Sequence, residues 1–374
     1  MDIKLLINPH KKDSSLPPSF NDGNYRTIRA FHQSLAEYRS TPLIPLADMS
    51  KRLGVEGIYV KDESQRFGLN AFKALGASWA IHRMITGGRQ VSAFVTATDG
   101  NHGKAVAWAA RKEGKPAYVF MPKGSAENRV RAIQDFGAVV KVTDSSYDDT
   151  VAFARSFAEE NGYALVQDTG MEGYTDIPMD ITMGYTTMAW EAAETLTEQG
   201  IVPTHVFLQA GVGSMAGGVM GLLLDYYKEN APMIVTMEPF AADCVFQSAL
   251  ENRSVTVDSE EPTIMAGLNC GTVSVCTYGM LMDRTDAFIS CSDSVAAEGM
   301  RILAYPEGSD GRIISGESGA VGAGIVSYLC GKPEYIRLRD ELKIDENSVI
   351  LLFSTEGATD PDNYKKIVGE GVLR

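Results

Sequence analysis

The chain has 374 residues, which is longer than one typical domain and long enough for two packed lobes. A formal net charge of −14 argues against nucleic acid as a partner, because phosphate binding requires a positively charged surface. The five cysteines form no Cys-x-x-Cys pair, so we expect a reducing compartment, the cytoplasm, and no disulfide framework. The N-terminus does not resemble a signal peptide and no apolar run reaches about 18 residues, so we expect no membrane span.

Hydrophobic patterning predicts strands that alternate with helices. Apolar residues spaced by three and four and followed by glycine indicate helices, whereas short β-branched or aromatic runs between Gly, Pro or Asp indicate strands. We expect an arm over residues 1–40 with one short helix near 28–37. The further expected elements, in chain order, are strand 57–63, helix 73–86, strand 91–98, helix 103–114, strand 117–122, helix 126–137, strand 138–143, helix 147–162, strand 163–168, a strand and helix within 204–227, strand 233–239 and a strand within 347–360.

This alternation predicts an α/β fold with parallel sheets and helices on both faces. Ligands of open α/β sheets bind at the carboxyl ends of the strands. The loops to inspect are therefore those after "FVTAT", "LVQD", "VFLQA", "VTMEP" and "LLFST".

A glycine-rich loop, "LQAGVGSMAGG", leads from a predicted strand into a predicted helix. Gly211, Gly213, Gly217 and Gly218 permit close backbone approach, and the helix N-terminus offers free N–H groups, so the loop favours an anion such as phosphate. It also fits the G-x-G-x-x-A dinucleotide pattern, with Glu238 near the place of a ribose-binding acid. An NAD enzyme is thus a rival interpretation, although the pattern lies unusually late in the chain for it.

Three further features bear polar groups at element ends. Lys73 lies between Phe72 and an apolar helix start; a desolvated lysine has a lowered pKa and is a usable nucleophile, although an isolated lysine of this kind is more often at the surface. The loop "TATDGNHG" contains Asn101, which can donate to a phenolate oxygen, or forms an ordinary capped turn. In "FSTEGATD", Ser354 or Thr355 could bond to a ring nitrogen, or end a strand in a plain turn.

The order of these features resembles one enzyme family. A lysine after Phe, a Gly-Asn loop, a midway glycine loop and a Ser-x-x-Gly strand end are similar, over about residues 40–365, to the tryptophan-synthase-β-like (fold type II) pyridoxal-phosphate enzymes. Within that group, "RFGLNAFKALGA", "TDGNHG", "VQDTGMEGY" and "LLFSTEGATD" resemble the diaminopropionate ammonia-lyases. The resemblance implies pyridoxal phosphate as cofactor, a small diamino acid as substrate and a homodimer.

The resemblance also implies roles for individual residues. Lys73 would bond the cofactor covalently, with Phe72 packed near its ring. Asp99 and Asp168 would be the catalytic acids. The remaining cofactor-binding residues would be Asn101 at the ring oxygen, Gly211, Val212, Gly213 and Ser214 at the phosphate, and Ser354 or Thr355 at the pyridine nitrogen. Glu317, Asn269 and His102 are lesser candidates near the site, and we expect no metal site.

Two aspartates suit a diamino acid. A β-amine leaves well only when it is protonated, and an ammonium group requires a carboxylate partner that a hydroxyl does not. The Cα proton points to opposite faces in the two enantiomers, so we hypothesise that Asp168 serves the L-isomer and Asp99 the D-isomer. A serine or threonine dehydratase of the same fold is the alternative, which Asp99 disfavours; a non-catalytic amino-acid-binding protein is a further one, which Lys73 disfavours. We expect a large domain of residues 1–85 and 180–374 and a small domain of residues 86–179.

Overall fold

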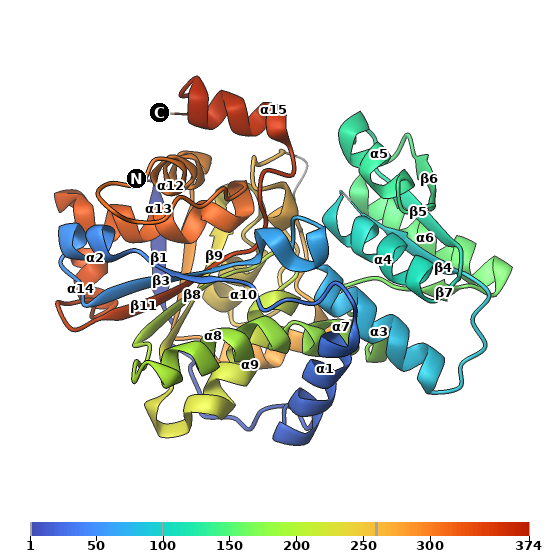
Figure 1. Ribbon diagram of the computed structural model, residues 1–374, viewed down its shortest axis with the longest axis horizontal. Coiled ribbons are helices and arrows are strands. Elements are labelled where there is room, and N and C mark those ends of the chain that lie inside the picture. Colours follow the sequence, from blue (N-terminus) through green and yellow to red (C-terminus); the bar gives the residue numbers. More distant parts are fainter. Residues whose placement is uncertain (1, 99, 259–260, 374) are drawn as a thin grey trace.

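The computed structural model describes residues 2–98, 100–258 and 261–373, which form two sheets surrounded by helices (Figure 1). Within these residues, the larger sheet has the strand order β1 (Ile3–Ile7), β10 (Ala287–Cys291), β9 (Met233–Pro239), β8 (His205–Gln209), β11 (Val349–Ser354), β3 (Gly57–Asp62), β2 (Leu43–Pro45). The smaller sheet has the order β6 (Val139–Val142), β5 (Ala117–Met121), β4 (Phe94–Ala97), β7 (Ala164–Leu165).

Helices cover the sheets on both faces. They are α1 (Asp22–Ser34), α2 (Ala47–Leu53), α3 (Ala74–Thr86), α4 (Asn101–Lys112), α5 (Glu127–Gln134), α6 (Tyr147–Asn161), α7 (Asp176–Gly184), α8 (Thr186–Glu198), α9 (Ser214–Tyr227), α10 (Cys244–Glu251), α11 (Val275–Arg284), α12 (Asp293–Ala304), α13 (Glu317–Gly331), α14 (Ile336–Glu341) and α15 (Pro361–Tyr364). In Figure 1, α12 and α13 lie on one side of the larger sheet, and α8 and α9 lie on the other. Among the described helices, none combines the length and the apolar character needed to cross a membrane.

The central strands run parallel, as predicted. In the larger sheet β3, β11, β8, β9 and β10 are parallel, and the smaller sheet is parallel throughout the described pairs. In the larger sheet β8, β10 and β11 are buried at every residue, which fits strands that helices cover on both faces, whereas β6 at the edge of the smaller sheet is mostly exposed. The four strands of the smaller sheet all come from within residues 86–179; the domain boundaries themselves stay a prediction.

The N-terminal segment corrects one expectation. Instead of an arm with a helix near 28–37, the structure has strand β1 followed by a longer helix over Asp22–Ser34. Strand β1 pairs antiparallel with β10, and Ile3 at its start is fully buried. Its five residues "IKLLI" carry too short a pattern to indicate a strand, because the partner that buries them lies far along the chain.

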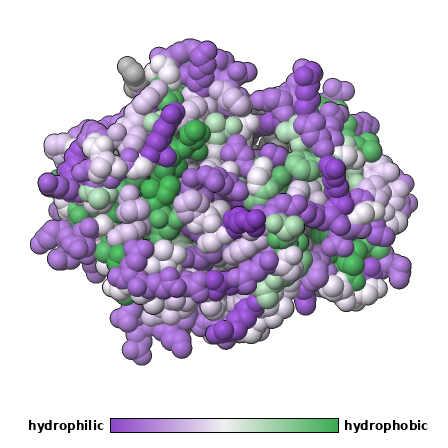
Figure 2. All heavy atoms as spheres, viewed as in Figure 1, coloured by the Kyte–Doolittle hydropathy of each residue, from purple (hydrophilic) through white to green (hydrophobic). Residues whose placement is uncertain are grey.

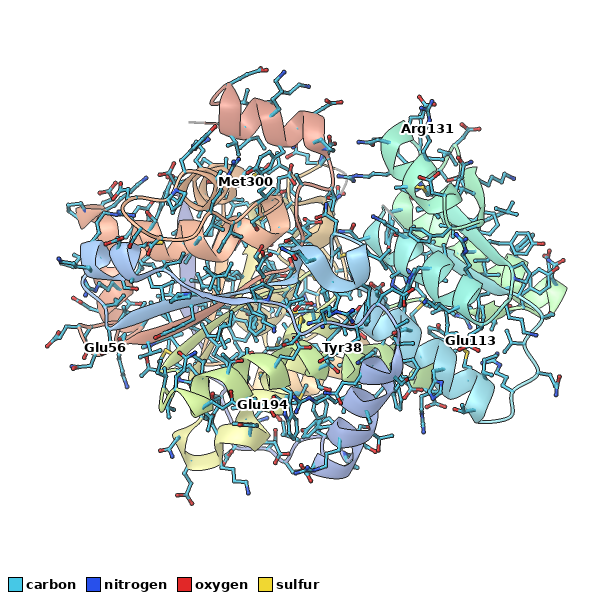
Figure 3. All side chains as sticks on the ribbon, viewed as in Figure 1. Tyr38, Glu56, Glu113, Arg131, Glu194 and Met300 are labelled. Carbon is cyan, nitrogen blue, oxygen red and sulfur yellow. The ribbon has the colours of Figure 1, made fainter. Side chains whose placement is uncertain are left out.

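Polar side chains cover most of the viewed face, and apolar atoms gather there only in smaller patches (Figure 2). The interior is mostly apolar, and among its buried polar side chains one group of charges lies beside the larger sheet. Lys61 and Arg66 donate to the Glu191 carboxylate at 2.6 and 2.8 Å, and Arg66 also pairs with Glu63 at 2.7 Å. Tyr38, labelled in Figure 3, donates its hydroxyl to Glu191. This group, which we call the buried charge cluster, anchors the loop that leads into Lys73.

Candidate active site

A cavity of about 180 Å³ joins residues from both sheets. Loops at the carboxyl ends of strands and the first turns of the helices that follow them form its wall, as the parallel fold predicts. The sequence-predicted residues that line it are Phe72, Lys73, Asn101, Asp168, Gly211, Val212, Gly213, Ser214 and Thr355. The structure thus brings most of the predicted site residues together.

Lys73 precedes helix α3 and projects its amine into the cavity. Its Nζ lies 2.6 Å from Oδ2 of Asp168, a residue 95 positions away in the sequence. Burial by itself would lower the pKa of the Lys73 amine, but the Asp168 carboxylate outweighs burial and raises that pKa. The expectation of a lowered pKa was therefore wrong, because it considered the apolar neighbours and not the carboxylate that the fold supplies.

Asp168 follows strand β7 and is held from several sides. Burial raises the pKa of its carboxyl, but the charge of Lys73 dominates and the net pKa is lowered. Nδ1 of His102, from α4, lies 3.7 Å from the same Oδ2. The hydroxyl of Ser214, the first residue of α9, donates to the backbone carbonyl of Asp168 at 2.8 Å. The phosphate-type loop and the aspartate are therefore directly connected.

Asn101 is the first residue of α4 and faces the cavity. Its Nδ2 donates to Oε2 of Glu356 at 2.5 Å, so this bond joins the smaller sheet's helix to the loop after β11. An amide nitrogen has a second hydrogen, which leaves one donor for a further acceptor. The predicted contact of Asn101 with a cofactor oxygen stays a prediction.

The glycine loop after β8 has the form of an anion cradle. Helix α9 begins at Ser214 without a side-chain cap, so its first N–H groups face the cavity. Gly213 has φ +87°, and a Cβ there would lie 2.5 Å from Cδ1 of Leu281. Gly211 approaches Cys270 so closely that a Cβ would lie 3.1 Å from its Sγ. Position 213 therefore favours glycine for its left-handed backbone, whereas a side chain at position 211 would require its neighbours to shift slightly.

The hydroxyls of Ser354 and Thr355, the two candidates for the ring nitrogen, lie in different surroundings. Ser354 is fully buried behind the wall, where its Oγ donates to Oγ of Ser315 at 2.8 Å. Thr355 lines the cavity, and its carbonyl accepts the backbone N–H of Phe72 at 3.1 Å. The ring of Phe72 packs on Tyr185, with ring centroids 4.8 Å apart. Which hydroxyl meets a ring nitrogen stays a prediction.

Two carboxylates complete the wall, and sequence reasoning missed one of them. Glu356 lines the cavity directly after Thr355, so the rule that ligands meet strand ends was sufficient to find it. Glu317, a lesser candidate, lines the same cavity and accepts a hydrogen bond from Nδ2 of Asn363 at 2.6 Å. Burial, and then the nearby charge of Glu356, raise the pKa of Glu317 to about 7.

The remaining candidates from the sequence lie in or near the cavity, in the core, or outside the described residues. Glu238 is fully buried and accepts the backbone N–H groups of Val245 and Phe246, so it caps α10 and is not positioned for a ribose. The loop near Asn269 borders the cavity through its neighbours Leu268 and Cys270. Asp99 lies outside the described residues. Among the residues that the structure describes, no group of His, Cys, Asp or Glu could hold a metal ion.

Comparison with known proteins identifies similar chains. The family model described as "Pyridoxal-phosphate dependent enzyme" matches residues 35–354. The chain is 46% identical to diaminopropionate ammonia-lyase of Escherichia coli K12, over 95% of this chain and 93% of that protein. It is 44% identical to that of Salmonella typhimurium LT2, over 99% and 98% respectively. The crystal structure of the Escherichia coli protein in complex with an aminoacrylate-PLP azomethine reaction intermediate superposes with a TM-score of 0.95, at 45% identity, covering 99% of this chain and 98% of that one.

Proposed function

Because this chain belongs to the pyridoxal-phosphate dependent enzyme family and, within it, to the diaminopropionate ammonia-lyases, we propose that it converts D- and L-2,3-diaminopropionate and water to pyruvate and two molecules of ammonia. It is a lyase that depends on pyridoxal phosphate. One observation carries the substrate assignment: the buried amine of Lys73 shares its cavity with the carboxyl groups of Asp168, Glu317 and Glu356. A substrate with a second ammonium group suits this acidic wall.

The residues present fit the cofactor. The uncapped start of α9 and the glycines before it offer N–H groups to a phosphate, and Lys73 offers an amine to an aldehyde. Two buried polar atoms that line the cavity, Oγ of Ser318 and Oε1 of Gln209, have no hydrogen-bond partner among the described residues. Unpaired buried polar atoms are costly, so their presence here supports a polar group bound between them.

The side chains divide the work of elimination. When bound, the cofactor withdraws electrons from the substrate Cα and makes its proton acidic. Lys73 and Asp168, 2.6 Å apart, can exchange a proton, so the pair is suited to remove the Cα proton on its side of the cavity. Carboxylates on the wall would hold the second amine as an ammonium group, the form in which it leaves. Val212 and Met215 help to close the cavity and limit the access of water.

The division between isomers rests on Asp168 and Asp99. Asp168 faces the cavity beside Lys73, which supports its role as the base for the L-isomer. The role of Asp99 for the D-isomer stays a proposal from the sequence. Exchange of Asp168 for Asn would then reduce turnover of the L-isomer more than that of the D-isomer, and equal losses would contradict the division.

Pyruvate release by the purified, cofactor-loaded protein tests the function. D- and L-2,3-diaminopropionate are compared with D- and L-serine at equal concentration, with Lys73→Ala as the inactive control. We expect both diamino acids to react faster than serine. Serine turnover that equals or exceeds diaminopropionate turnover would contradict this proposal and indicate a general dehydratase.

We also propose a homodimer, which rests on the family resemblance, and a cytoplasmic location, which rests on the five cysteines without a Cys-x-x-Cys pair. Light scattering of the eluting protein during size-exclusion chromatography gives the mass in solution. A mass of one chain of 40.5 kDa would contradict the homodimer.

A further inference from the structure

The imidazole of His102 stands beside Asp168 with one nitrogen unused. It is buried, with 5% of its surface exposed, and its Nε2 lies 2.8 Å from the backbone carbonyl oxygen of Val166. Its Nδ1 lies 3.7 Å from Oδ2 of Asp168 and makes no hydrogen bond to any described residue. The sequence placed His102 in the asparagine loop without a function, and the proposed reaction does not use it.

The bond to Val166 determines where the imidazole carries its proton. A carbonyl oxygen only accepts hydrogen bonds, so Nε2 must carry a hydrogen. In a neutral imidazole Nδ1 is then a bare lone pair, and here it faces a carboxylate oxygen. Two acceptors that face each other in a buried site are unfavourable, and a proton between them removes the conflict.

Oδ2 of Asp168 therefore has two neighbours of different kinds. Lys73 compensates its charge at 2.6 Å while the amine is a free ammonium group. In the proposed function Lys73 would be bonded to the cofactor until the substrate amine takes its place, so the cofactor-loaded protein without substrate would lack the free ammonium group. Among the described residues, His102 is then the basic side chain beside this oxygen, at 3.7 Å.

We propose that His102 is a positioning residue for Asp168, and that a proton taken up by Asp168 passes to Nδ1 of His102. The O–H bond of the carboxylic acid breaks and an N–H bond forms at Nδ1. Asp168 is then again a carboxylate and His102 an imidazolium with hydrogens on both nitrogens. The inference rests on the proposed function in taking Asp168 as an acid–base residue and Lys73 as the residue bonded to the cofactor.

The surrounding charges agree with this assignment. Burial is the largest effect on His102 and keeps its pKa below the ordinary value, although the Asp168 carboxylate raises it. The Lys73 charge lowers this pKa further, so loss of that charge favours the imidazolium. Among the described residues, the phenols of Tyr174 and Tyr185 also interact with Asp168, and burial raises the pKa of both. They stay neutral where His102 titrates.

NMR of the cofactor-loaded protein with ¹⁵N-labelled histidine tests the proton position without substrate. The chain has five histidines. The histidine signal that disappears in His102→Gln is assigned to His102. We expect the Nε2–H tautomer at high pH, and in Asp168→Asn a pKa for His102 that is lower by about one unit. His32 is the internal control, since Thr187 and Leu75 occupy both of its nitrogens. An Nδ1–H tautomer, or a pKa that Asp168→Asn leaves unchanged, would overturn the inference.

The pH profile of pyruvate release tests the effect on Asp168. In His102→Gln the amide N–H can still donate to the Val166 carbonyl, but no basic nitrogen faces Asp168. We expect kcat to fall by about 100-fold, within the range for general acid–base assistance, with KM nearly unchanged. We also expect the acid limb to move up by about one pH unit, because the imidazolium lowers the pKa of Asp168.

An unchanged acid limb in a folded, cofactor-loaded His102→Gln protein would overturn the inference. If that variant does not fold, substitution of the other four histidines one at a time assigns the His102 signal by elimination, and the NMR comparison of the original protein with Asp168→Asn still decides. Absence of pyruvate from the unsubstituted protein would contradict the proposed function alone, because the NMR experiment uses no substrate.

Discussion

Nζ of Lys73 lies 2.6 Å from Oδ2 of Asp168, although the lysine directly precedes helix α3 and the aspartate lies in the loop after β7. The contact links the larger sheet's loop to the smaller sheet. It also reverses the effect of burial on the lysine, whose pKa is raised rather than lowered. A charged pair at this distance can hold one proton on either partner. Glu317 and Glu356 line the same cavity and form its acidic wall.

Glu356→Gln is predicted to weaken selection of diamino acids over serine. The amide oxygen of Gln can still accept the hydrogen bond from Asn101, so only the negative charge is removed. We expect kcat/KM for diaminopropionate to fall by about 10- to 100-fold, the value of one charge-assisted hydrogen bond, and kcat/KM for serine to fall less. Thr359→Val is the matched control, because it removes the 3.3 Å bond to Glu356 and keeps the charge. Equal losses with both substrates would contradict the prediction.

Gly213→Ala is predicted to weaken cofactor binding at the start of α9. The backbone there has φ +87°, and the added Cβ would lie 2.5 Å from Leu281. A left-handed conformation costs a residue with a Cβ about 1–2 kcal/mol, so in the variant the cofactor-free loop leaves this conformation and must return to it on binding. We expect the Kd for pyridoxal phosphate to rise by about 5- to 30-fold. Titration of the cofactor-free protein with pyridoxal phosphate, followed by absorbance, measures this Kd.

The control for this variant is Gly279→Ala in α11. A Cβ at Gly279 would meet no atom within 4 Å, and alanine favours a helix. This second variant should bind the cofactor as the original protein does. A Gly213→Ala protein with unchanged Kd would show that the cradle tolerates the side chain.

Glu317 is predicted to make stability depend on pH between about 4.5 and 7. Its folded pKa is raised from 4.5 to about 7, so the unfolded chain releases this proton at lower pH than the folded chain does. The loss of stability that Glu317 causes is absent below pH about 4.5, grows as pH rises, and levels off above pH about 7. The shift of roughly 2.5 units corresponds to about 3 kcal/mol lost across this window.

Urea unfolding of the original protein and of Glu317→Gln, at several pH values from 4.5 to 8, measures this loss. The substituted amide can still accept the hydrogen bond from Asn363. The original protein should lose stability relative to the variant as pH rises. Curves that stay parallel over the window would rule out the raised pKa.

Glu191→Gln is predicted to destabilise the buried charge cluster. Oε2 of Glu191 forms ion pairs with Lys61 and Arg66 at N–O distances of 2.6 and 2.8 Å, and all three side chains are at most 1% exposed. Removing one charge leaves a buried cation uncompensated, so we expect a loss of about 3–5 kcal/mol in the free energy of unfolding.

Arg131→Gln is the control, since Arg131 projects from α5 on the outside of the molecule (Figure 3) and its pair with Glu127 is exposed. Its effect should stay within about 0.5 kcal/mol. Denaturant unfolding compares the two variants. A Glu191→Gln protein as stable as the control would mean that the cluster relaxes or admits water.

Much of the architecture follows from local sequence patterns. The alternation of strands and helices, the parallel sheets and the glycine loop at Gly211–Ser214 depend on periodicity and on residues with special backbone freedom, which act over a few neighbours. Lys73, Asn101 and Thr355 were found because each lies at an element end, and parallel strands bring such ends to one edge. Strand β1 was missed because the β10 strand that buries it lies 280 residues away.

The chemistry of the site depends on contacts that no local pattern contains. Asp168 meets Lys73 across 95 positions, and Asn101 meets Glu356 across 255. Coulomb energy and desolvation depend on distance and burial in space, so the sign of a pKa shift is decided when folding brings a partner near. Apolar neighbours in the sequence indicated a neutral lysine at position 73, and a carboxylate supplied by the other sheet keeps it charged.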